Sequence, residues 1–198
     1  MSFYLAMFMY SISMAITPGP NNLISMAAGV RYGFKNVLPF VSGITCGFGI
    51  LSLASGVGLG QIATGNTTFM KILGYGGTVI ICYLAFKIAT SKPEIVVNEK
   101  DKPKFIHGVI FQCINPKAWV GSIAGISAFK LVGNYEQLGI YIVMYCVLVF
   151  MSVSIWAYGG SIIVEYLSDQ RRHRIFNIIM GMSLFAVALY LFFMQLDF

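Results

Sequence analysis

The sequence has few charged residues, and acidic ones are the scarcer kind. Only 10% of its 198 residues are charged, with 13 lysines and arginines against seven aspartates and glutamates, whereas 58% are hydrophobic. A chain of this length has too little interior to hide so much apolar surface from water. The composition therefore excludes a soluble domain and predicts an all-α integral membrane protein.

Acidic side chains are missing from the deep parts of the apolar runs. Glu136 falls in a predicted loop, and Glu165 lies near the end of a predicted span. A relay of buried carboxylates for protons, or a carboxylate cage for sodium, is therefore not visible in the sequence.

The residue patterns of common catalytic sites are missing as well. There is no Gly-x-x-x-x-Gly-Lys-Ser/Thr loop for ATP, and neither His107 nor His173 lies within a span beside a nucleophile or metal ligands. We therefore expect no enzymatic activity, no metal and no cofactor. All four cysteines fall inside spans at no metal-ligand spacing, which favours free thiols over disulfides: Cys46, Cys82, Cys113 and Cys146.

Long apolar runs are what the chain has instead. The first lacks a basic start and is too long for the apolar region of a signal peptide, so we interpret it as a retained span. Together the runs predict one transmembrane transporter domain over residues 1–198. Six runs are long enough to cross a bilayer, at residues 3–30, 37–62, 69–90, 105–130, 137–165 and 175–196.

Basic side chains gather in alternate loops between these runs. Lys71 and Lys130 fall on the other side, and Lys117 falls within a span. The positive-inside rule then places the first, third and fifth loops in the cytoplasm and both termini outside, and it leaves no basic surface for nucleic acid. The residues in or beside those three loops are Arg31, Lys35, Lys87, Lys92, Lys100, Lys102, Lys104, Arg171, Arg172 and Arg174.

The chain divides at one polar stretch, residues 91–104, into a first repeat at about 1–90 and a second at about 105–198. Each half holds three spans, and an odd number gives the halves opposite orientations. Each half also opens with a helix interrupted by proline, at Pro18 and at Pro116. We therefore predict six transmembrane helices as two inverted three-helix repeats, with helices 1 and 4 broken by proline. Two incidental prolines are the alternative.

Lys117 is a charged residue in the middle of the uncharged run from Phe105 to Phe129. At ~1.5 Å per residue it lies ~18 Å from the start of that run, near the midplane of a ~30 Å hydrocarbon layer. Placing lysine there costs roughly 2.5–3.5 kcal/mol, and such residues usually mark a substrate or ion path. The alternative is a misplaced span boundary that lets the ammonium reach an interface.

The two proline breaks predict a binding site at the midplane. Thr17 before Pro18, and Asn115 before Pro116, resemble N-caps followed by proline at the first helical position. Each break would aim helix N-terminal amides into the membrane, where they favour a small anion such as the carboxylate of a zwitterion. Lys117 adds a positive charge and is the best-placed titratable group for proton coupling. The predicted substrate-binding residues are Thr17, Pro18, Gly19, Pro20, Asn21, Asn22, Asn115, Pro116 and Lys117.

Other side chains near the breaks have more ordinary explanations. We expect Gln112, Ser122 and Ser127 either to line the same cavity or to bond within their helix. Glycine pairs at spacing four predict close helix packing, whereas Gly29 is assigned to the turn after the first span. The packing glycines are Gly43 and Gly47, Gly56 and Gly60, Gly121 and Gly125, and the neighbours Gly159 and Gly160.

At these motifs the chain resembles the lysine-exporter and homoserine–threonine-resistance (LysE/RhtB) family of bacterial amino-acid exporters. The asparagines after Pro20, with the run 87–91, look more like the O-acetylserine/cysteine branch than the lysine branch. The resemblance covers the whole length, and the motifs that carry it are Thr17-Pro18-Gly19-Pro20-Asn21-Asn22, Gly33-Phe34, Gly43-x-x-x-Gly47, Tyr83-Leu84-Ala85-Phe86-Lys87 and Asn115-Pro116-Lys117-Ala118.

The resemblance implies a multi-pass carrier of the bacterial inner membrane that expels small neutral amino acids or derivatives and is driven by protons. A homo-oligomer, with membrane lipid around it, is compatible with the sequence. A channel, a membrane scaffold protein, and an exporter of another small metabolite or cation are the alternatives. Direction and substrate are not encoded in the motifs themselves.

Overall fold

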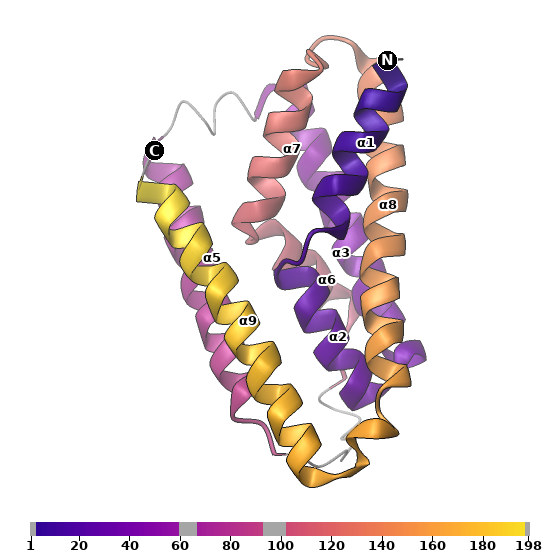
Figure 1. Cartoon of the computed structure of the whole chain (residues 1–198). Helices are drawn as coiled ribbons and strands as arrows, with labels where there is room; N and C mark the ends of the chain where they lie inside the picture. Colours follow the sequence, from indigo (N-terminus) through magenta and orange to yellow (C-terminus); the bar gives the residue numbers. More distant parts are fainter. Residues whose placement is uncertain (1–2, 60–66, 93–101, 197–198) are drawn as a thin grey trace.

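The computed structural model describes residues 3–59, 67–92 and 102–196, and every regular element in those ranges is a helix (Figure 1). The predicted all-α class is therefore confirmed. Most of the predicted loop at 91–104, and residues 60–62 of the second predicted span, lie outside the described residues. The elements are α1 (Phe3–Ile16), α2 (Pro20–Tyr32), α3 (Phe34–Ala54), η1 (Ser55–Leu59), α5 (Thr67–Ala89), α6 (Phe105–Cys113), α7 (Pro116–Ala128), α8 (Tyr135–Ile162), η3 (Tyr166–Ser168) and α9 (Gln170–Leu196).

Three of the described helices are long and apolar enough to cross a bilayer. They cover Phe34–Gly58, Tyr135–Ile162 and Gln170–Phe193, and shorter apolar helices cover Phe3–Ile16 and Gly74–Ala89. The first and fourth predicted spans each form two short helices, because proline interrupts them. Each proline break therefore lies inside an apolar run, where the freed backbone groups need partners from the protein.

The helices pack as a central group with a lateral pair. α3 packs on α6 and α8, and α8 also packs along α1 and α2. Figure 1 shows α5 and α9 side by side, leaning away from α1 and α7 toward the end that carries the N-terminus. Val37, Phe48 and Tyr141 belong to the core of the central group, and Ile81 and Leu184 to a second core between α5 and α9.

Glycines allow the closest helix contacts. A Cβ at Gly29 would clash with the backbone carbonyl of Ala157, and one at Gly160 would clash with that of Met26. α2 and α8 therefore touch backbone to backbone, as small residues permit in membranes. Gly29 lies inside α2, so its assignment to a turn was wrong. The predicted packing role of Gly160 is confirmed.

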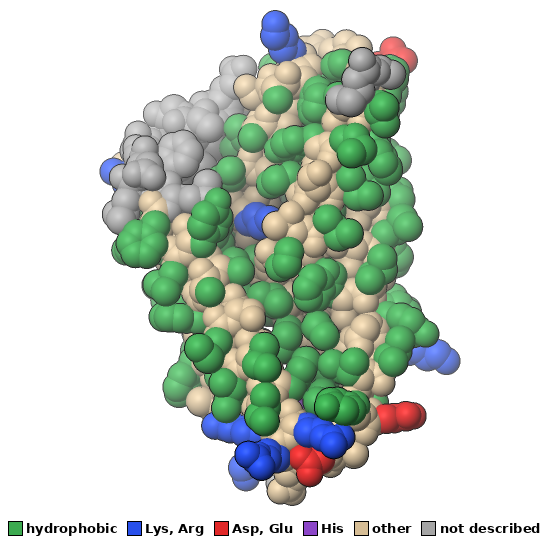
Figure 2. All heavy atoms as spheres, viewed as in Figure 1, with side chains coloured by type: hydrophobic (Ala, Val, Ile, Leu, Met, Phe, Trp, Pro, Cys, Tyr) green, Lys and Arg blue, Asp and Glu red, His purple; other side chains and the backbone are tan. Residues whose placement is uncertain are grey.

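The predicted cytoplasmic loops meet at one end of the molecule. Both Nη1 of Arg174 and Nδ2 of Asn177 donate to the Ser91 carbonyl at 3.4 Å, which ties the start of α9 to the end of α5. Figure 2 shows basic side chains gathered at that lower end, and Figure 1 shows the N-terminus at the opposite end. The structure thus groups the basic loops as expected, while the side of the membrane stays a prediction.

Candidate functional site

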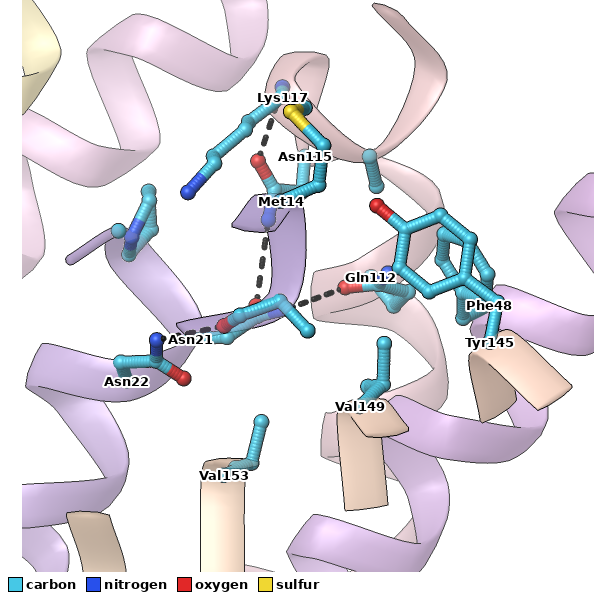
Figure 3. Close-up of a pocket in the computed structure, with 14 residues that line it drawn as sticks. Met14, Asn21, Asn22, Phe48, Gln112, Asn115, Lys117, Tyr145, Val149 and Val153 are labelled. Carbon is cyan, nitrogen blue, oxygen red and sulfur yellow. Dashed lines mark hydrogen bonds between the residues drawn. The ribbon is translucent and has the colours of Figure 1, made fainter. Parts of the chain in front are cut away.

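The two proline breaks meet in the middle of the molecule and enclose a small pocket (Figure 3). α1 ends and α2 begins on one side, and α6 ends and α7 begins on the other. The pocket has a volume of about 50 Å³, which corresponds to roughly three to five water-sized positions. Two helix N-termini and two helix C-termini therefore lie around one polar cavity.

Six of the nine predicted site residues line this pocket. Thr17 and Pro18 line a neighbouring cavity instead, and the ring of Pro116 lies against Gly77 of α5. The six that the structure brings together are Gly19, Pro20, Asn21, Asn22, Asn115 and Lys117.

The two breaks are capped differently. Asn115 is the N-cap of α7, since its Oδ1 accepts from the Lys117 backbone N–H at 3.1 Å and Pro116 follows at the first position. The matching prediction for Thr17 was wrong, because α2 begins at Pro20 and its N-cap is Gly19, with no side-chain cap. Thr17 instead donates its hydroxyl back to the Ser13 carbonyl in α1.

Proline chemistry explains the difference. A residue before proline avoids helical backbone angles, and Gly19 precedes Pro20 with φ −156° and ψ 177°. A helix therefore cannot start at Pro18, and the first free amides belong to Asn21 and Asn22. Their backbone N–H groups have no hydrogen-bond partner in the described part of the chain. The N-terminus of α2, unlike that of α7, is left open for an anion.

A chain of side-chain amides bridges the two breaks. Asn115 Nδ2 donates to Asn21 Oδ1 at 3.2 Å, and Asn21 Nδ2 donates to Gln112 Oε1 at 2.6 Å. Gln112 and Asn115 are buried, with 2% and 3% of their surface exposed. The prediction that Gln112 lines the cavity is confirmed, and its NH₂ group has no partner among the described residues. That group remains available to a bound solute.

Ser122 and Ser127 do not belong to the pocket. Ser122 is buried and donates to Ser52 Oγ at 3.0 Å, while Ser127 is exposed on α7. Ser122 therefore follows neither expectation: it does not line the pocket, and its hydroxyl bonds to α3 rather than within its own helix.

Side chains also satisfy the carbonyls at the end of α1. Lys117 Nζ donates to the Thr17 carbonyl at 3.0 Å. Asn22 Nδ2 donates to the carbonyls of Ala15 at 3.1 Å and Thr17 at 3.2 Å, and Ser152 Oγ donates to Ala15 at 2.8 Å. These carbonyls have lost their helical donors and carry the negative end of the helix dipole, so a cation and amides stabilise them.

Lys117 uses only part of its hydrogen-bonding capacity in this contact. An ammonium group has three N–H donors, and the Thr17 carbonyl is its one hydrogen-bond acceptor among the described residues. The ammonium, the Gln112 amide and the open start of α2 therefore all have unused donors in the pocket lining, while the described lining residues include no aspartate or glutamate.

The other wall of the pocket is apolar and was not predicted. It consists of Met14 from α1, Phe48 from α3, and Tyr145, Val149 and Val153 from α8. The rings of Phe48 and Tyr145 lie 4.3 Å apart between centroids. No sequence motif marks these residues, because the sequence does not distinguish the apolar residues of a helix that line the pocket from those that pack elsewhere.

A larger cavity adjoins the pocket on the side of α9. It has a volume of about 570 Å³, and Lys117 and Met14 line both spaces. Thr17, Tyr10 and Tyr190 line the larger one as well. A third cavity, of about 290 Å³ at the basic end, shares no lining residue with the pocket. The pocket thus adjoins the cavity away from the basic end and is separated from the cavity at that end.

Clusters of metal ligands are missing from the described residues. No group of three or more His, Cys, Asp or Glu side chains is placed to hold a metal ion in those ranges. The arrangement is therefore suited to holding a small zwitterion, with its carboxylate at the amides and ammonium and its side chain at the apolar wall.

A family model for LysE type translocators matches residues 12–195. The chain belongs to the LysE family. Its curated relatives include the cysteine/O-acetylserine efflux protein of Salmonella paratyphi A, which is 28% identical over 195 residues, or 95% of this chain and 96% of the relative. The proteins of the same name from Escherichia coli O1:K1 / APEC, 26% identical over 193 residues, and Klebsiella pneumoniae subsp. pneumoniae, 29% identical over 122 residues and 62% of each chain, also match.

No solved structure gives a significant match. Membership of the LysE family confirms the resemblance of the proline motifs, and together with the efflux proteins among its relatives it points to a transporter rather than an enzyme. Within this LysE-family chain, two of the five motifs of the resemblance, residues 17–22 and 115–118, are the segments that meet at the pocket.

Proposed function

We propose that the chain is a secondary transporter that exports small neutral amino acids or derivatives, of the cysteine/O-acetylserine or homoserine/threonine type, across the bacterial cytoplasmic membrane. The observation that carries this proposal is the pocket at the two breaks, where Lys117, Gln112 and the uncapped start of α2 offer donors to a carboxylate. The names of the curated relatives support the same substrate class.

Pocket size supports a small substrate. A volume of about 50 Å³ admits a side chain of a few heavy atoms against Met14, Phe48 and Tyr145, whereas an aromatic side chain needs the walls to move. The described lining also has no acid to neutralise the cationic end of lysine or arginine.

Six spans in two inverted repeats are part of this proposal, with both termini outside. Exchanging the halves maps α1, α2, α3 and α5 onto α6, α7, α8 and α9. The packing of α3 on α6 then corresponds to that of α8 on α1, and the packing of α2 on α8 to that of α7 on α3. This correspondence is the expected consequence of an inverted repeat with its site at the repeat interface.

Alternating access follows from the same geometry. The amide bridge from Asn21 to Gln112 joins the two halves of the chain at the pocket, which shares no lining residue with the basic-end cavity. Lys117 and Met14, in contrast, border both the pocket and the large cavity near α9. We assign this arrangement to a state closed toward the cytoplasm. Opening that side requires the bridge to part, and proton transfer at Lys117 is the proposed coupling step.

Transport by the purified protein in liposomes tests the proposal. Saturable counterflow of O-acetylserine, cysteine, homoserine or threonine, with little exchange of lysine or phenylalanine, is the expected result. An imposed proton gradient should then drive accumulation. A flux that rises linearly with concentration and shows no counterflow contradicts a carrier and indicates a channel.

A further inference from the structure

The cavity at the basic end lies between the two halves of the chain. It has a volume of about 290 Å³ and is lined by residues from α2 and α5 of the first half and from α6 and α9 of the second. It shares no lining residue with the central pocket, so the substrate contacts of the transport proposal do not account for its side chains.

Positive and titratable side chains line this cavity. Arg31, Lys87 and Lys92 contribute cationic groups, and His107 and His173 contribute imidazoles. None of the three cationic groups makes an ion pair with a described residue, and the described lining includes no aspartate or glutamate. A cluster of cations with no acidic partner among the described residues attracts an anion.

One atom of the arginine and one of the histidines are shielded from solvent within the lining. The Arg31 Nε atom is shielded from solvent and has no hydrogen-bond partner in the described structure. The side chain of His173 is 6% exposed, and no described residue accepts or donates a hydrogen bond to it. A buried polar atom normally has a partner, so the Arg31 Nε atom points to a ligand that supplies one.

The rest of the lining is apolar, with Phe40, Leu84 and Phe111 among its members. The outer faces of the same helices are apolar too: Phe86 on α5 is 67% exposed, and Ile110 on α6 is 52% exposed. A cavity with both cationic and apolar lining, on helices whose outer faces are apolar, fits an amphiphile better than a free ion.

We propose that this cavity binds the phosphate headgroup of an anionic phospholipid, with its acyl chains against the apolar faces of α5 and α6. Arginine offers the phosphate a planar pair of donors, and the two lysines add charge at the rim. Basic pockets between transmembrane helices are suited to such headgroups. The lipid bridges the two halves of the chain and holds them together at this end. The proposal does not depend on the central pocket or its substrate.

Thermal unfolding of the purified full-length protein in a neutral detergent tests the site. Short-chain phosphatidylglycerol should raise the melting temperature with saturation, because a ligand that binds the folded state stabilises it. Phosphatidylcholine with the same chains should not. Inorganic phosphate at equal ionic strength separates a lipid from a soluble anion: equal stabilisation by phosphate overturns the lipid assignment.

Charge-removing variants inside and outside the cavity show whether the stabilising lipid binds there. Arg31→Gln and Lys87→Gln should each raise the half-saturating lipid concentration roughly tenfold, the scale of one lost charged hydrogen bond. Lys35→Gln and Arg171→Gln remove the same charge from exposed positions at the same end and outside the cavity, so they should leave it unchanged. Lys87 is exposed at the rim, which makes its variant informative even where Arg31→Gln folds poorly. Equal losses in the controls overturn the proposal, as does stabilisation by phosphatidylcholine.

Discussion

The ammonium of Lys117 lies 3.0 Å from the carbonyl oxygen of Thr17, a residue 100 positions earlier in the chain. The contact joins the start of α7 to the end of α1, so it links the two proline breaks directly. Since the carbonyl is one that lost its helical donor, the lysine stabilises the break and borders the pocket at once. A substrate carboxylate that draws the ammonium toward itself would therefore loosen the link between the halves.

Removal of the Lys117 charge should abolish transport. Lys117→Met keeps the bulk of the stem, so we expect a folded protein in which counterflow falls at least tenfold, the scale of one lost charged hydrogen bond. Lys117→Arg keeps the charge but not a releasable proton. It should support counterflow without uphill transport if the lysine couples protons, and both activities if it only anchors the carboxylate. Wild-type rates in Lys117→Met would remove this residue from the mechanism.

The side chains of the amide bridge should be energetically coupled to one another. Asn21→Ala leaves the Oε1 atom of Gln112 and the Nδ2 atom of Asn115 without partners inside buried residues, so unfolding in detergent should become easier by about 1–3 kcal/mol. The double variant Asn21→Ala/Gln112→Leu should cost less than the sum of the single variants, by about 0.5–3 kcal/mol. Additive costs in this cycle would show that the two side chains act independently.

The sequence predicted the positions of the breaks well, because proline acts on the backbone locally. It also identified Lys117 and Asn115, whose unusual context is visible along the chain. The start of α2 was misplaced because two prolines compete for the first position, and only the extended backbone of Gly19 decides between Pro18 and Pro20.

The apolar wall and the partners of the polar groups required the packed structure. Phe48 and Tyr145 come from different helices, and nothing in their local sequence distinguishes them from other buried aromatics. Likewise, the Thr17 carbonyl is a backbone atom that any residue would supply, so the sequence could not mark it as the acceptor for Lys117. Gly29 was missed because its contact with Ala157 depends on how α2 crosses α8.

Closing the first break should also stop transport. Pro18→Ala with Pro20→Ala restores two backbone donors and allows α1 to continue toward α2. The amides of Asn21 and Asn22 would then be tied into helical bonds, so we expect membrane insertion to persist and counterflow to fall below a tenth of the wild-type rate. Transport at equal expression is the measurement. Full activity of the double variant would mean that the open helix start is not used.

The orientation can be measured by cysteine labelling in intact cells. In a background that lacks the four native cysteines, single cysteines at Lys92 and Arg172 should resist an impermeant thiol reagent, whereas one at Asn134 should react. All three positions are exposed, so burial does not protect them, and permeabilised cells provide the control. Labelling at position 92 with protection at position 134 would reverse the proposed topology.

Neighbouring glycines in α8 offer a matched test of the α2–α8 contact. A Cβ at position 160 would meet the backbone of Met26, whereas one at position 159 would meet no atom within 4 Å. Gly160→Ala should therefore destabilise the protein by about 1–3 kcal/mol, since backbone must move to admit the methyl group. Gly159→Ala should be neutral or stabilise by up to about 1 kcal/mol, because alanine favours helix. Unfolding in detergent gives both values, and equal effects at the two positions would contradict the backbone contact between α2 and α8.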